Sequence, residues 1–207
     1  MQGKLKLGYW DIQGIGQIIR YLLEYMGVSY EDHGYKNDEE WLKDKFNLGL
    51  DFPNLPYLID GDIKLTESFA IVNYVPIRFK HPQLLGGNEF DRILAFQVYG
   101  VLGDIENEMF LLTQVKPEDY EAKKVETYKK VQLKLGYLEK FLGSKDFFLG
   151  YVTYADFFLL LVWETIKAID EKLVEGYKGL SALSDRVANL EKIKAYRASE
   201  RFRKKVF

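Results

Sequence analysis

Cysteine is absent from the 207 residues of the chain. Disulfide bonds, thiolate metal sites and catalysis by a thiol of the protein itself are therefore excluded, and a cytoplasmic location is expected. A strong excess of charge of one sign is also lacking, because 29 Lys and Arg side chains stand against 31 Asp and Glu side chains. Nucleic acid is accordingly not an expected partner.

Long apolar segments are missing as well. The first eleven residues contain no apolar run of the kind that a signal peptide needs. The densest apolar stretch, residues 155–163, is far shorter than the ~18 residues of a membrane-spanning helix. We therefore expect no association with a membrane.

The first part of the chain alternates between strand and helix patterns. Apolar side chains make up 47% of the sequence, which is enough for the core of one large domain or two small ones. Apolar runs predict strands over 5–9, 28–35, 57–59 and 63–65, and helical spacing predicts helices over 15–26, 38–48 and 66–74. This order favours a small mixed sheet with helices on both sides, an α/β fold.

The second part of the chain has a different texture. Residues 90–112, 117–142, 153–169 and 181–196 carry the apolar spacing of helices, and no β-rich segment remains. We therefore predict an α/β domain over 1–80, a linker over 81–88 and an all-helical domain over 89–207. Thr153 and Asp156 fit a capping box that begins one of these helices, and we assign them a structural role.

The stretch DFPNLPYLID, residues 51–60, places two prolines just before a predicted strand. Pro56 is either an ordinary loop proline or the second residue of a cis peptide bond. A cis Leu55–Pro56 bond would hold the backbone N–H and C=O of Leu55 outward. That exposed pair would bind an extended peptide in the manner of a neighbouring strand.

The segment Thr66-Glu67-Ser68 begins a predicted helix close to this strand. Ser68 would present a hydroxyl, free backbone N–H groups and the positive end of the helix dipole, which together suit a carboxylate. Glu67 beside it would suit an ammonium group. A ligand with an amino-acid head fits this pair, although simple helix capping explains the same residues.

Several motifs are similar to those of one enzyme family: LGYWDI at 7–12, IRYLLEY at 19–25, KFNLGLDFPNLPYLIDG at 45–61, ESFAI at 67–71 and LEKIKAY at 190–196. On these residues the chain resembles a cytosolic glutathione transferase, closest to the mu class. The first 75 residues carry the likeness most strongly. The resemblance implies a thioredoxin-like N-terminal domain of α/β type, an all-α C-terminal domain and a homodimer.

The resemblance also implies a reaction, in which glutathione is the co-substrate and no metal is used. The thiolate of glutathione would attack a small hydrophobic electrophile, and Tyr9 would be the catalytic residue that donates a hydrogen bond to the sulfur. Such a bond lowers the pKa of a thiol. Tyr99, Phe110 and Tyr120 lie in the region expected to receive the electrophile, but each also fits a helix core.

Other residues acquire roles by position within the motifs. The resemblance implies that Phe52 docks into a second subunit, and that Asp104 reaches the glutathione bound by the other subunit. The residues expected to contact glutathione are Trp10, Ile15, Trp41, Lys45, Asn54, Leu55, Pro56, Glu67, Ser68 and Asp104.

The chain departs from the mu pattern in several places. Gln13 stands where an arginine is usual, Asp38 lies near the place of a ligand-binding arginine, and Glu67 replaces a glutamine. Pro76 is expected to kink or end its helix. The tail that partly covers the mu active site is also missing after Phe207. Two alternatives therefore stand beside the transferase: a glutathione-dependent isomerase or peroxidase, and a non-enzymatic scaffold that kept the fold.

Overall fold

The computed structural model describes residues 5–207, which form two compact units. One unit contains the chain up to Pro82 together with residues 190–207, and the other contains residues 83–189. The predicted all-helical domain, 89–207, differs from this grouping because α8 (Glu191–Arg197) packs with α1 (Gly16–Met26) of the first unit. The predicted boundaries at 1–80 and 81–88 remain predictions.

The first unit is built on a four-stranded mixed sheet. Its strands are β1 (Lys6–Trp10), β2 (Glu31–Tyr35), β3 (Tyr57–Asp60) and β4 (Ile63–Thr66), in the order β2-β1-β3-β4. β1 runs parallel to β2 and antiparallel to β3, and β3 runs antiparallel to β4. The mixed sheet agrees with the one predicted from the element order, and its arrangement is the thioredoxin-like one that the resemblance implied.

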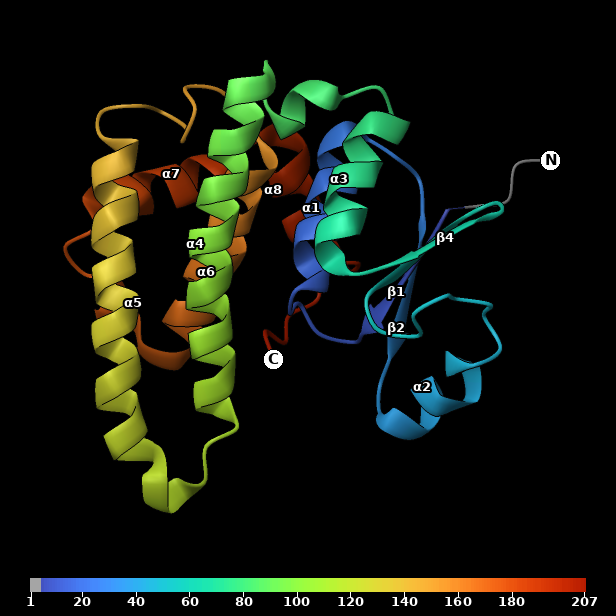
Figure 1. Ribbon diagram of the computed structural model, residues 1–207, viewed down its shortest axis with the longest axis horizontal. Coiled ribbons are helices and arrows are strands. Elements are labelled where there is room, and N and C mark those ends of the chain that lie inside the picture. The colour runs from blue at the N-terminus through green and yellow to red at the C-terminus, as the bar shows by residue number, and fades with distance from the viewer. Residues whose placement is uncertain (1–4) are drawn as a thin grey trace. The chain divides into compact units, whose positions relative to one another are not determined.

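Helices cover this sheet from different sides. α1 and α3 (Ser68–Arg78) pack side by side, and α2 (Asp38–Lys45) lies apart from them (Figure 1). On the α2 side, Gly8 of β1 faces the ring of Tyr57, and a Cβ at Gly8 would lie 2.1 Å from Cζ of that ring. Only glycine fits there, because Tyr57 is fully buried.

The predicted elements are present with shifted ends. The strand expected over 28–35 begins only at Glu31, and the helix expected over 38–48 ends at Lys45. α3 begins at Ser68 and continues through the buried Pro76 to Arg78. The helix therefore continues for two residues past the proline, which lacks the N–H that would bond to the preceding turn.

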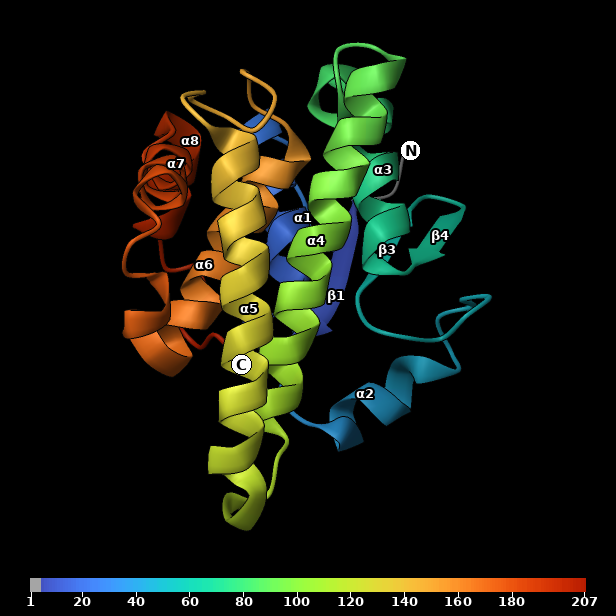
Figure 2. The same cartoon turned by 60° about the vertical axis from the view of Figure 1, so that its left-hand side comes forward.

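The second unit is entirely helical among the residues described. It contains α4 (Glu89–Thr113), α5 (Tyr120–Leu142), α6 (Tyr154–Asp170) and α7 (Lys178–Ala188), with short 3-10 turns at Pro82–Leu85, Pro117–Asp119 and Glu171–Val174. α4 and α5 lie side by side, and α6 is almost wholly buried between its neighbours (Figure 2). The capping box is confirmed, since the Thr153 N–H donates to Oδ2 of Asp156 over 2.7 Å.

The carboxyl group of Glu106 in α4 is an exception within the largely apolar interior of this unit. Its Oε1 lies 3.5 Å from the Thr165 hydroxyl, and its buried Oε2 has no hydrogen-bond partner among residues 5–207. Burial raises the pKa of Glu106 to about 7. The folded protein therefore holds this group protonated at a pH where the unfolded chain ionises it.

Glu106→Gln is expected to change the pH dependence of stability. Because the pKa is raised on folding, the contribution of Glu106 is fully favourable below pH ~4.5 and is lost as the pH rises through about 7. The variant should therefore be more stable than the wild type at pH 8, by up to ~3 kcal/mol, with a smaller difference at pH 5. Urea unfolding at both values measures this, with exposed Glu118→Gln as control. A difference that is the same at both values would contradict the prediction.

Candidate functional site

Tyr9 lies on the strand face that also carries Leu7, and both side chains are buried. The turn that leads into α1 covers the phenol. A Cβ at Gly14 would lie 2.7 Å from the Tyr9 hydroxyl, and a Cβ at Gly16 would lie 2.5 Å from the Cδ1 atom of its ring. Gly14 also has a φ of +39°, which favours glycine. The chain thus approaches the tyrosine closely through two glycines.

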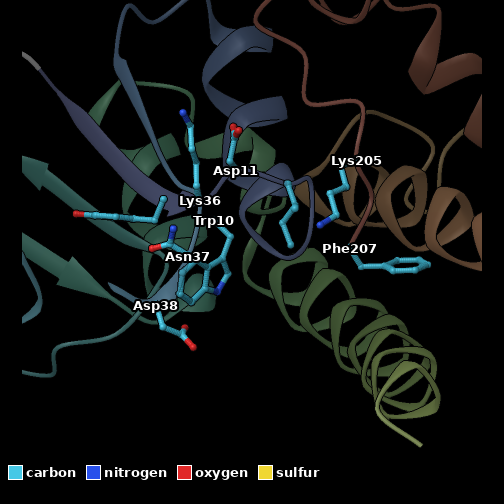
Figure 3. A pocket seen from close by; sticks show the side chains of 9 residues that line it. Trp10, Asp11, Lys36, Asn37, Asp38, Lys205 and Phe207 are labelled. Carbon is cyan, nitrogen blue, oxygen red and sulfur yellow. The ribbon is translucent and has the colours of Figure 1, made fainter. Parts of the chain in front are cut away.

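Trp10, the next residue of β1, is half-buried and lines a cavity of about 470 Å³. Figure 3 shows Trp10, Asn37 and Asp38 on one side of this space and Lys205 and Phe207 on the other. Its lining is completed by Asp11, Ile12, Tyr35 and Lys36. All these residues belong to the first unit, so the cavity combines three aromatic side chains with charged groups from both ends of the chain.

Trp41 fixes α2 to the sheet. Its ring stacks on that of Tyr57 at a centroid distance of 6.2 Å and meets the ring of Tyr35 edge-on at 5.3 Å. The Tyr35 hydroxyl donates to Asp44 over 2.8 Å, and burial together with hydrogen bonding raises the pKa of Tyr35. Lys45 at the end of α2 stays partly exposed, with its ammonium 5.5 Å from the Phe46 ring centroid.

The Leu55–Pro56 peptide bond is cis, as one of the two alternatives predicted. No backbone hydrogen bond joins Leu55 to another residue in the described part of the chain, and Asn54 before it is exposed. The segment therefore offers an unpaired N–H and C=O directly before β3. This is the feature that an extended peptide requires for strand-like pairing.

Glu67 and Ser68 lie beside this segment because Tyr57 pairs with Thr66 across β3 and β4. Glu67 has a φ of 66°, an unusual value for a residue with a side chain. Ser68 is the first residue of α3, so its backbone N–H lies among the free donors of a helix N-terminus. Since Gly8 pairs with Tyr57, the end of β1 that carries Tyr9 and Trp10 lies at the same end of the sheet as the start of β3.

The remaining predicted site residues have different surroundings. Ile15 is half-buried at the start of α1, and Phe52 is 75% exposed, as a dimer contact would require. Asp104 of α4 is paired with the Lys134 ammonium of α5 at 2.5 Å within the second unit. The ring of Tyr99 stacks on that of Phe158 at a centroid distance of 4.5 Å, which agrees with the alternative that Tyr99 belongs to the helix core.

Sequence reasoning missed a group of charged residues near Tyr9. Arg20 is fully buried and its Nε donates to both carboxylate oxygens of Asp32 over 3.1 and 3.2 Å. Arg203 from the far end of the chain binds Asp32 and also Asp11. The one signal available was an arginine inside the apolar run around Ile19.

A thioredoxin-like sheet with a cis proline at one edge, together with an all-helical unit, defines the glutathione transferase fold. The family models for the glutathione S-transferase N-terminal and C-terminal domains match residues 5–76 and 104–200. The class-mu 26 kDa isozyme 7 glutathione S-transferase of Fasciola hepatica is 39% identical over 95% of this chain and 89% of its own. Glutathione S-transferase Mu 1 of Rattus norvegicus is 38% identical, over 95% and 91%.

Solved structures agree with these relatives. The crystal structure of the glutathione S-transferase Blo t 8 superimposes with a TM-score of 0.85 at 31% identity, covering 95% of this chain and 93% of that one. The chain therefore belongs to the glutathione S-transferase family and is mu-like. Among residues 5–207 no helix is long and apolar enough to cross a membrane.

Proposed function

We propose that this protein is a glutathione transferase that conjugates the thiolate of glutathione to small hydrophobic electrophiles. The observation that carries the proposal is the meeting, at one edge of the sheet, of Tyr9, the unpaired backbone of Leu55 and the N-terminus of α3 at Ser68. These three features match the sulfur, the central amide backbone and the γ-glutamyl carboxylate of the tripeptide.

Glutathione fits this edge in an extended conformation. Its cysteinyl backbone would pair with the N–H and C=O of Leu55, next to cis Pro56, with Asn54 alongside. The γ-glutamyl carboxylate would accept hydrogen bonds at Ser68, and Glu67 would pair with the ammonium group. Trp10, Trp41 and Lys45 would contact the glycine end of glutathione. Ile15, at the start of α1, would also contact the tripeptide.

Tyr9 supplies the chemistry at the sulfur. A free thiol has a pKa of ~8.5, and only the thiolate is a good nucleophile. A hydrogen bond from the Tyr9 hydroxyl stabilises the anion and so lowers the pKa of the bound thiol. The thiol proton passes to solvent, the sulfur forms a bond to the electrophilic carbon, and the leaving group departs with the electrons of the broken bond.

A homodimer is part of the proposal. The exposed ring of Phe52 would enter an apolar pocket of a second copy of the chain, because a large apolar side chain at 75% exposure favours a partner. Asp104 would exchange its pairing with Lys134 for the ammonium of the glutathione bound by the other copy. A detoxifying role in the cytoplasm is also part of the proposal. The isomerase, peroxidase and scaffold alternatives share the fold, but no contact described above favours them.

Conjugation of an aryl halide tests the proposal directly. Purified protein with glutathione and 1-chloro-2,4-dinitrobenzene should release one chloride for each thioether formed, at a rate proportional to the amount of protein. Calorimetry with glutathione alone measures binding separately. Binding without conjugation would favour the isomerase or peroxidase, and the absence of binding would favour the scaffold.

A further inference from the structure

The C-terminal segment, residues 199–207, lies along the turn at residues 11–14 that follows β1. The Gln13 N–H donates to the Lys205 carbonyl over 2.7 Å, and the Gly14 N–H donates to the Val206 carbonyl over 3.0 Å. The side chain of Gln13 donates from Nε2 to the Arg203 carbonyl over 2.9 Å. Three hydrogen bonds therefore attach this segment to the turn beside Tyr9.

Arg203 fixes the segment through two carboxylates. Its Nη1 lies 2.6 Å from Oδ1 of Asp11, and its Nη2 lies 3.1 Å from Oδ2 of Asp32. Nη2 also lies 3.3 Å from the Asp32 carbonyl. Asp11 belongs to the turn and Asp32 to β2, so the guanidinium joins the turn to the sheet.

Arg20 holds the same turn from the other side. Its Nη1 donates to the Ile12 carbonyl over 2.8 Å and to the Gln13 carbonyl over 3.3 Å. Its Nε binds the Asp32 carboxylate that Arg203 also binds. The N–H groups of the turn therefore donate to the C-terminal segment, and the carbonyl groups of the same turn accept from Arg20.

The turn in question is the one that covers the phenol of Tyr9. Gly14, whose N–H is held by the C-terminal segment, approaches the hydroxyl so closely that a Cβ would lie 2.7 Å away. A shift of the turn by less than an ångström would change the space and the backbone dipoles around that hydroxyl. Arg203 is linked to the hydroxyl through one residue of the turn, Asp11, and the backbone that follows it.

We propose that Arg203 is a positioning residue for the reaction. By pairing with Asp11 and Asp32 it clamps the turn, and the clamped turn holds the Tyr9 hydroxyl where it can donate to the glutathione sulfur. This inference rests on the proposed transferase function. It differs from a merely structural role because loss of the clamp changes the ionisation of the bound thiol and not only the stability of the fold.

The test compares variants of two arginines from the same segment. Arg203→Ala should raise the pKa of enzyme-bound glutathione, read from thiolate absorbance against pH, by about one unit, which lowers kcat about tenfold below that pKa. The KM for glutathione should change less than twofold, and the rate should recover at high pH. Arg203→Lys keeps the charge but lacks the planar fork with which the guanidinium reaches both carboxylates, and it should be intermediate.

Arg201→Ala is the matched control, because Arg201 pairs with Glu24 of α1 and not with the turn. It should leave the thiol pKa unchanged even where it lowers thermal stability. Asp11→Asn should reproduce the effect of Arg203→Ala, and the double variant should add little to either. Amide hydrogen exchange at residues 11–16 in the ligand-free protein should become faster in Arg203→Ala and remain unchanged in Arg201→Ala.

The outcomes separate this inference from the proposed function. If the wild type ionises bound glutathione and Arg203→Ala leaves the pKa of the bound thiol unaltered, the positioning role alone is overturned. Equal pKa shifts in the Arg201 and Arg203 variants also overturn it, because the segment would then act only through the fold. A wild-type protein that forms no thiolate overturns the proposed function, and the positioning role falls with it whatever the hydrogen exchange shows.

Discussion

Tyr9→Phe is expected to lower kcat for aryl halide conjugation by about 10- to 150-fold at neutral pH. The change removes one hydroxyl from a buried ring and leaves the packing of the ring against Gly16 in place. A hydrogen bond to a charged group contributes ~1.5–3 kcal/mol, which corresponds to a rise of about one to two units in the pKa of the bound thiol. The expected loss of rate is therefore a loss of thiolate.

The pH dependence distinguishes this cause from damage to the fold. Because the variant thiol still ionises at high pH, its rate should approach that of the wild type as the pH rises. Tyr137→Phe is the control, since that side chain is 59% exposed on α5. A Tyr9→Phe enzyme with a wild-type rate at neutral pH would show that some other group stabilises the sulfur.

Arg20→Met is expected to lower the free energy of unfolding by ~3–5 kcal/mol, the cost of breaking a buried ion pair by removing one partner. Arg20 has no exposed surface, and its removal leaves the carbonyl groups of Ile12 and Gln13 without their donor. Methionine nearly conserves the shape of the arginine side chain, so the loss of unfolding free energy measures the lost polar contacts more than the lost volume.

Urea unfolding measures this loss, with Lys43→Met as the control. Lys43 forms an exposed pair with Glu39 one helical turn away, and such pairs contribute ~0.3–0.5 kcal/mol. The double variant Arg20→Met with Asp32→Asn should recover part of the loss, because it no longer leaves a half-buried carboxylate short of one partner. Equal losses for Lys43→Met and Arg20→Met would contradict the assignment.

Local patterns in the sequence predicted those parts of the fold that neighbouring residues decide. The capping box at Thr153 and Asp156 depends on four consecutive residues, and the hairpin around Gly61 depends on three. The cis bond before Pro56 was one of two alternatives from spacing. Element ends were less accurate: β2 begins at Glu31 because pairing with β1 starts there, and spacing does not record pairing.

Contacts between distant segments could not be predicted from the sequence. Arg203 is separated from Asp32 by 171 positions, and no periodicity links the two. Asp104 of α4 pairs with Lys134 of α5, thirty residues later, and helical spacing did not indicate this pair; the contact of Asp104 with a second subunit stays a prediction. The single helix predicted over 181–196 is two helices, α7 and α8, and the spacing gave no indication that α8 belongs with the first unit.

The grouping of residues 190–207 with the first unit has a consequence for synthesis of the protein. The first 82 residues leave the ribosome long before the helix whose Arg197 donates to the Tyr21 hydroxyl over 2.8 Å. Until that last helix emerges, the surface of α1 that it covers stays open to water. The nascent N-terminal unit is therefore completed only after the intervening helices have been translated, when residues 190–207 cover the surface of α1.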